Sequence, residues 1–106
     1  MAFKGNIKKS TAVEAELRVD NTATGSALIV IAFDDDGGNS GADSIVVAPS
    51  ATESVRVATK NEEGHLQIRV DFGSESDPGH LTVRTNGTIK TSEDIQGDTT
   101  WSYTIG

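Results

Sequence analysis

The sequence predicts an all-β fold, an antiparallel sandwich of two sheets built from about eight or nine short strands. Three features of the sequence point to this fold. Apolar and polar residues alternate along most of the chain, turn-forming segments interrupt the alternation, and no stretch repeats its apolar residues with the period of a helix. Short strands separated by frequent turns are typical of sandwiches with Greek-key connections, so we expect such connections here.

The clearest alternation predicts a strand over 12–20. Val13, Leu17 and Val19 share one face of this segment, while Glu14 and Arg18 share the other. One face is therefore expected to be buried and the other to be solvated. The full set of expected strands is 2–8, 12–20, 26–34, 44–48, 53–59, 65–72, 80–85, 88–92 and 99–105.

A hairpin is predicted between the segments 80–85 and 88–92. Asn86 and Gly87 separate them, and both residues tolerate the positive φ angles that a type I′ turn requires. The other segments between strands are also rich in Gly, Asn, Asp, Ser and Pro, which favour turns. If every strand crosses the domain once, the loops near 34–43, 60–64 and 86–87 lie at one end of the sandwich.

The segment 26–34 departs from simple alternation because both of its faces are apolar. Ile29 and Ile31 make one face, and Leu28 and Val30 make the other apolar as well. A neighbouring loop or a chain terminus could cover the second face. The alternative is an interface between subunits, since monomers rarely leave such a patch in water.

Length and charge narrow the functional classes. The 106 residues fit a single domain, 1–106, and the absence of Cys means that core burial must hold it together. Sixteen acidic against nine basic residues give a formal charge of −7, which disfavours nucleic acid and anionic membranes as partners. No apolar run is long enough to span a membrane.

The densest acidic feature is a Gly-rich loop that carries four Asp residues. Oxygen ligands on a flexible loop suit Ca²⁺, although the spacing does not match an EF-hand. Strand counting brings a second acidic loop, with two Glu residues, to the same end. We therefore expect calcium as a cofactor there, the alternative being a solvated acidic loop. The candidate metal ligands are Asp34, Asp35, Asp36, Asp43, Glu62 and Glu63.

Two aromatic residues near the C-terminus are candidates for ligand binding. Trp101 and Tyr103 share one face of the segment 99–105, and sugar-binding modules use exposed aromatic rings for stacking. The alternative is that both rings belong to the core, since Ile105 continues the same face. A carbohydrate or a protein is accordingly the expected kind of ligand.

Catalysis is not expected. His65 and His80 each follow a turn Gly and open a strand, which places them at opposite ends of the domain and in solvent. There is no G-x-S-x-G motif, and the acidic residues crowd loops where water keeps them ionised. A pocket joining either His to a buried carboxylate would favour an enzyme.

The sequence therefore favours a non-enzymatic binding module, lectin-like or adhesive and assisted by calcium, that uses the acidic loops. Rigid strands with polar loops and no catalytic pairing support this interpretation. The alternative is a self-assembling structural subunit that uses the apolar outer face around Leu28 and Val30. Such a subunit would form homo-oligomers. A small enzyme is the third class.

Overall fold

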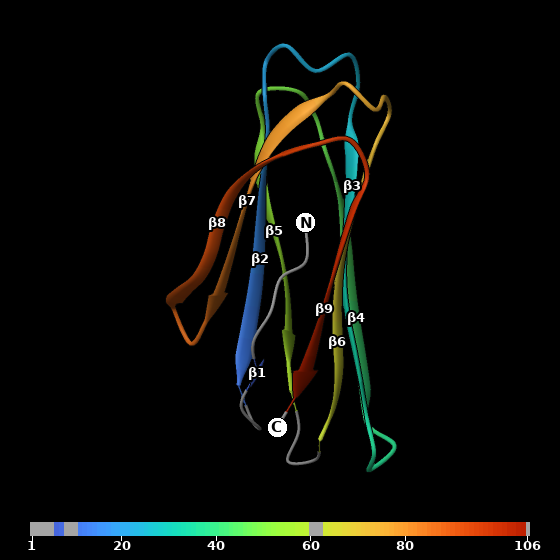
Figure 1. Ribbon diagram of the computed structural model, residues 1–106, viewed down its shortest axis with the longest axis vertical. Coiled ribbons are helices and arrows are strands. Elements are labelled where there is room, and N and C mark those ends of the chain that lie inside the picture. Colours follow the sequence, from blue (N-terminus) through green and yellow to red (C-terminus); the bar gives the residue numbers. More distant parts are fainter. Residues whose placement is uncertain (1–5, 8–10, 60–62, 106) are drawn as a thin grey trace.

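The computed structural model describes residues 6–7, 11–59 and 63–105, and these residues form two sheets packed face to face (Figure 1). This confirms the predicted all-β sandwich. No helix among these residues is long and apolar enough to cross a membrane. In chain order the strands are β1 (Asn6–Ile7), β2 (Ala12–Val19), β3 (Ala27–Asp35), β4 (Ser40–Val47), β5 (Thr52–Ala58), β6 (Gly64–Phe72), β7 (Pro78–Thr85), β8 (Thr88–Gln96) and β9 (Thr99–Ile105).

Sheet A has the strand order β1-β9-β6-β3-β4, and sheet B has the order β5-β2-β7-β8. The pairings are antiparallel except for the short parallel pair of β1 with β9. Most neighbouring strands within a sheet are not consecutive in the chain. For example, β2 lies between β5 and β7, and β6 lies between β3 and β9. Greek-key connections between two sheets produce such interleaving. β4 and β5 end their sheets on one side of the sandwich.

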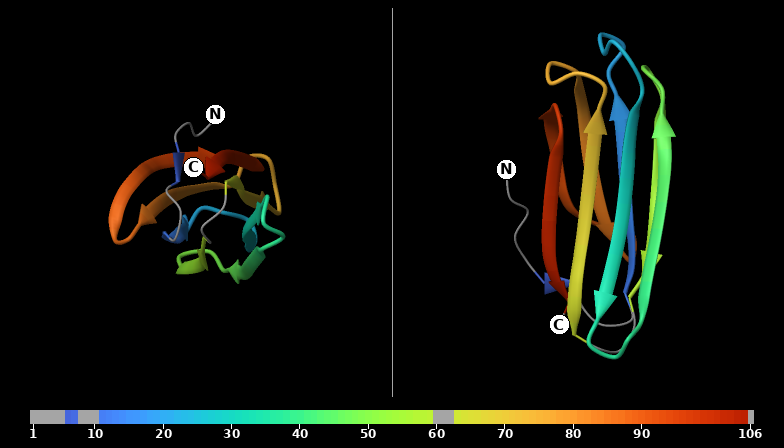
Figure 2. Two further views of the ribbon diagram at one scale, coloured as in Figure 1. Left: turned by 90° about the horizontal axis from the view of Figure 1, so that it is seen from below. Right: turned by 90° about the vertical axis from the view of Figure 1, so that its right-hand side faces the viewer.

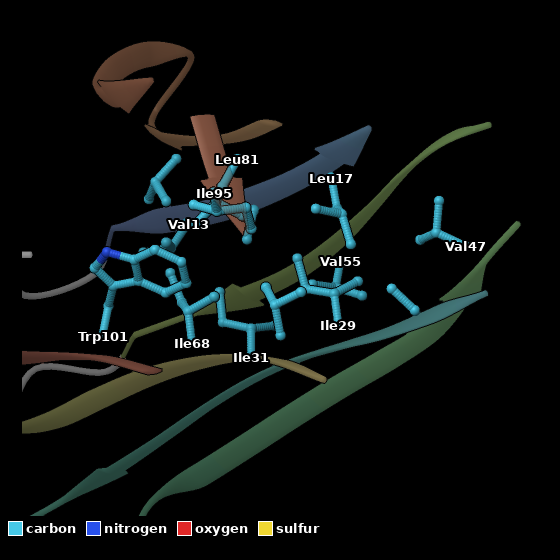
Figure 3. Packing of buried hydrophobic residues seen from close by; sticks show 14 of the residues in the cluster. Val13, Leu17, Ile29, Ile31, Val47, Val55, Ile68, Leu81, Ile95 and Trp101 are labelled. Atoms are coloured by element: carbon cyan, nitrogen blue, oxygen red, sulfur yellow. The ribbon is translucent and has the colours of Figure 1, made fainter. Parts of the chain in front are cut away.

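The core fills the space between the sheets, where the side chains of both inner faces meet (Figure 3). Leu17 on β2, Ile29 and Ile31 on β3, and Leu81 on β7 are all fully buried. Each follows the two-residue alternation that predicted its strand. Burying a side chain of this size stabilises the fold by about 1.5–3 kcal/mol, so the sandwich holds without disulfides.

The loops gather at the two ends of the sandwich, as strand counting predicts (Figure 2). At one end the backbone N–H of Asp36 donates to the carbonyl of Glu63, 2.7 Å away, which joins the β3–β4 turn to the segment before β6. At the other end the N–H of Asp20 donates to the carbonyl of Pro78, 3.0 Å away. The acidic loop after β3 and Glu63 therefore do meet.

β4 begins four residues before the predicted strand 44–48 and shortens the acidic loop. Gly41 pairs with Phe33, and a Cβ at Gly41 would lie 2.5 Å from the Phe33 ring. Because Gly41 has no side chain, the Phe33 ring can lie over it. The pairing of β3 with β4 therefore continues to Asp34 and Ser40. The sequence prediction treated this glycine as part of a loop.

β8 also extends beyond its predicted end at residue 92, and a β-bulge interrupts its pairing with β7. Asn86 and Gly87 have φ angles of 48° and 82°, which confirms the predicted hairpin turn. The register then shifts between Val83 and Arg84. Because one extra residue reverses the faces of a strand, the bulge turns Ile95 into the core and leaves Ile89 56% exposed.

Candidate functional site

The acidic β3–β4 turn is held by the side chain of Asp35. Its Oδ1 accepts hydrogen bonds from the backbone N–H groups of Gly37 and Asn39, at 3.0 and 2.7 Å. Asp35 is 7% exposed, and its Oδ2 has no hydrogen-bond partner among the described residues. Asp34 and Asp36 are both exposed and flank it in sequence. Asp35 therefore shapes this turn and points inward between them.

Asp43 lies apart from this turn, on β4. It pairs with Ile31, whose face is the inner one, whereas Asp34 pairs with Ser40 on the outer face. The Oδ1 of Asp43 accepts from the N–H of Ser44 at 2.9 Å, and its Oδ2 accepts from the N–H of Arg56 at 3.1 Å. This carboxylate is thus occupied in joining β4 of sheet A to β5 of sheet B.

The described part of the predicted metal site is not a cluster. No group of three or more His, Cys, Asp or Glu side chains within residues 6–7, 11–59 and 63–105 could hold a metal ion. Glu63 is exposed and meets the turn through its backbone carbonyl, while Glu62 lies outside the described residues. Calcium at this end of the sandwich stays a prediction of the sequence.

Trp101 lies in the core, where its side chain is 1% exposed (Figure 3). It pairs with Ile68 across the β6–β9 ladder, and its indole N–H has no acceptor among the described residues. In this position the ring offers no face to a sugar, in agreement with the alternative that it belongs to the core. The side chain of Tyr103 lies outside the described part of the structure.

The outer face of β3 and β4 is the apolar surface that the doubly apolar strand predicts. Leu28 and Val30 are half-buried there, and Val46 lies opposite Leu28 on β4 and is 62% exposed. Ala32 and Ala42 continue the same face as a cross-strand pair. No described segment covers Val46, so the predicted covering loop does not extend to β4.

A polar network occupies the outer face of sheet B. Glu14 on β2 accepts from Arg56 Nε at 2.8 Å and lies 3.5 Å from Arg84 Nη1 on β7. Arg84 also reaches Glu16, again at 3.5 Å. These ion pairs link β5, β2 and β7 in one ladder. Exposed pairs of this kind contribute about 0–1 kcal/mol each, so they organise the surface more than they stabilise it.

Next to this ladder, His80 bridges two residues of the edge strand β8. Its Nδ1 lies 2.8 Å from Asp94 Oδ1, and its Nε2 lies 2.7 Å from Ser92 Oγ. Thr82 Oγ1 is 3.4 Å from the same Ser92 oxygen. The hydrogen bond with His80 lowers the pKa of Asp94 below its ordinary value of 3.8, and the charge of Arg18 acts in the same direction.

An open hollow of about 540 Å³ lies beside Asp94, at the end of the sandwich away from the acidic turn. Arg18 provides the positive charge in its wall, and Ile95 provides an apolar patch. The complete lining is Arg18, Asp20, Pro78, Gly79, Asp94, Ile95 and Gln96.

The Ser92–His80–Asp94 group was not apparent from the sequence. His65 and His80 do lie at opposite ends, as predicted, and His65 is exposed, but His80 is half-buried and hydrogen-bonded. An uninterrupted hairpin around Asn86-Gly87 would set His80 opposite Glu93. The β-bulge sets it opposite Asp94 instead, with Ser92 on the same face.

Comparisons with known proteins found no relative of this chain. No family model, no curated protein and no solved structure matches the chain.

Proposed function

We propose that this domain is a binding module that associates with a second copy of itself through strand β4. The observation that carries the proposal is Val46, which is 62% exposed on the last strand of sheet A and continues the apolar outer face of β3. Large apolar side chains at an uncovered sheet edge favour association with another chain.

β4 lacks two of the devices that usually protect an edge strand, basic side chains and Pro. Its sequence, SGADSIVV, contains no Lys, Arg or Pro. Its single charged side chain, Asp43, belongs to the inner face and is held by the N–H of Arg56. The outer face of β4 consequently presents small or apolar side chains and no charge, which leaves the strand open to pairing with another strand.

β4 is also self-complementary. An antiparallel pairing on a two-fold axis at Ser44 would set Ala42 opposite Val46 of the partner subunit, so a small side chain meets a large one. Asp43 would face Ile45 of the partner subunit, so no two carboxylates meet directly. A self-complementary patch of this kind is what a symmetric dimer requires. Such pairing would extend sheet A across both copies.

Sedimentation velocity over a range of protein concentrations tests this proposal. We expect the intact protein to dimerise, and Val46→Lys to weaken the dimer about tenfold or more, because the ammonium would be placed in an apolar interface. Ile89→Lys is the matched control, since Ile89 is 56% exposed but lies on β8 of the other sheet. The control should leave the dimer unchanged.

Three outcomes would overturn the proposal: a protein that stays monomeric at every concentration, a Val46→Lys variant that associates as well as the intact protein, or equal losses in both variants. A monomer that binds immobilised glycans would instead favour the lectin-like module, with sugar held by the loops.

A further inference from the structure

We propose that Ser92, His80 and Asp94 form a hydrogen-bonded relay that makes Ser92 a nucleophile toward small activated carboxylic esters. The relay lies on sheet B, away from β4, and does not depend on the proposed dimer. The three side chains stand on neighbouring strands, with His80 on β7 between Ser92 and Asp94 on β8.

The two distances suit a group in which a serine is the nucleophile, a histidine is its base and a carboxylate orients the histidine. Ser92 Oγ lies 2.7 Å from His80 Nε2, within reach for proton transfer. Asp94 Oδ1, 2.8 Å from Nδ1, accepts a hydrogen bond from the N–H group there. This hydrogen bond selects the tautomer with a proton on Nδ1, which leaves the lone pair of Nε2 directed at the serine.

One neighbour supports the same arrangement. The hydroxyl of Thr82 is 3.4 Å from Ser92 Oγ and 6% exposed, so a hydrogen bond between the two hydroxyl groups can hold the serine oxygen in place. Ser92 itself is exposed, so an ester can reach it from solvent.

The reaction has two balanced steps. In the first, Ser92 Oγ attacks the carbonyl carbon while its proton passes to His80 Nε2, the bond to the aryloxide leaving group breaks, and His80 Nε2 gives that proton to the departing aryloxide. In the second, water attacks the acyl-serine while His80 Nε2 takes a proton from that water, the bond between the acyl carbon and Ser92 Oγ breaks, and His80 Nε2 returns the proton to Ser92 Oγ. The net change is ester plus water to carboxylic acid plus phenol.

The exposure of the relay limits the rate. The side chain of Asp94 is 90% exposed, so water screens its interaction with His80. A missing oxyanion donor costs a serine hydrolase about 10²–10³-fold in rate, and the Thr82 hydroxyl faces Ser92 Oγ instead of the carbonyl oxygen of an ester. The proposal therefore concerns esters with good leaving groups, such as p-nitrophenyl acetate.

The test is acetylation by p-nitrophenyl acetate, followed by mass spectrometry of the intact protein and of its peptides. We expect Ser92 to be acetylated about tenfold faster than Ser102, an exposed serine on β9. Ser92→Ala should remove the fast reaction, and His80→Gln should slow it about tenfold. Circular dichroism checks that both variants keep the fold, which their partly or fully exposed positions favour.

Asp94 is a positioning residue, so its test needs a separate readout. In ¹⁵N spectra, neutral His80 should carry its proton on Nδ1 in the intact protein, and Asp94→Asn should populate the other tautomer. Labelling of Ser92 no faster than Ser102, or a fast reaction that survives His80→Gln, would overturn the proposal. The three side chains would then serve to fasten the edge strand β8 to β7.

Discussion

The carboxylate of Asp43 on β4 accepts a hydrogen bond from the backbone N–H of Arg56 on β5, 3.1 Å away. β4 ends sheet A and β5 ends sheet B, so this contact joins the two open edges on one side of the sandwich. The inward-pointing carboxylate of Asp43 accepts from a backbone N–H at the edge of β5, and it opposes pairing of β5 with a strand of another molecule.

Replacing Asp43 with Ala should lower the free energy of unfolding by about 1 kcal/mol, because hydrogen bonds to the N–H groups of Ser44 and Arg56 are lost. Urea denaturation measures the change. Asp34→Ala is the control, since this exposed side chain makes no hydrogen bond with the described residues, and it should alter stability by less than about 0.5 kcal/mol. Equal effects of the two substitutions would contradict the bridging role of Asp43.

Gly64 should not tolerate a side chain. A Cβ at this position would lie 2.5 Å from the Cα of Asp35 on the neighbouring strand β3, and backbone atoms have little room to move within a sheet. Gly64→Ala should therefore reduce the free energy of unfolding by about 2 kcal/mol or more.

Gly25→Ala provides the matched control, because a Cβ there meets nothing within 4 Å. Thermal and chemical unfolding of both variants compare the two positions. A Gly64→Ala protein as stable as Gly25→Ala would mean that β3 and β6 are not packed as closely as described.

The hydrogen bond between His80 and Asp94 gives stability a defined dependence on pH. Because the pKa of Asp94 is lowered on folding, its contribution is present above pH 3.8 and is lost as the pH falls through the lowered value. The difference in unfolding free energy between the intact protein and Asp94→Asn should shrink as the pH falls below 3.8.

The same comparison in a His80→Gln background isolates the partner, since the pH dependence from Asp94 should be weaker there and rest on the charge of Arg18. An NMR titration of the Asp94 carboxyl gives the pKa directly. A midpoint at or above 3.8 would refute the interaction.

Calcium titration with thermal unfolding tests the acidic end of the sandwich. A ligand that binds the native state raises the melting temperature, and the stabilisation grows with the logarithm of the ligand concentration above Kd. We expect no rise, because Asp35 is held by its own turn, Asp43 is held by Arg56, and Asp34 belongs to the opposite face from Asp43.

The combined variant Asp34→Asn and Asp36→Asn makes the calcium result specific, since both side chains are exposed at the turn. A calcium-dependent rise that this variant abolishes would show that the turn rearranges around the ion, together with residues outside the described part such as Glu62. The sequence expectation of a calcium-assisted module would then hold.

The fold class and the faces of most strands follow from local patterns in the sequence. Alternation with a period of two is a local property, so Val13 and Leu17 on β2 could be assigned to the core without knowledge of their neighbours. The Asn86-Gly87 turn was equally local, because positive φ angles depend on the residue itself. Strand counting also placed the loops at the correct ends.

Which side chains meet depends on contacts between distant parts of the chain. Ile89 and Ile95 are six residues apart and would share one face of a regular strand, but the bulge in β8 buries Ile95 and exposes Ile89. The same bulge brings Ser92 and Asp94 to His80. Burial of Ile95 against residues far away in sequence favours this register, and the isolated hairpin contains no such contact. Pairing between distant strands likewise made β4 an edge and exposed Val46.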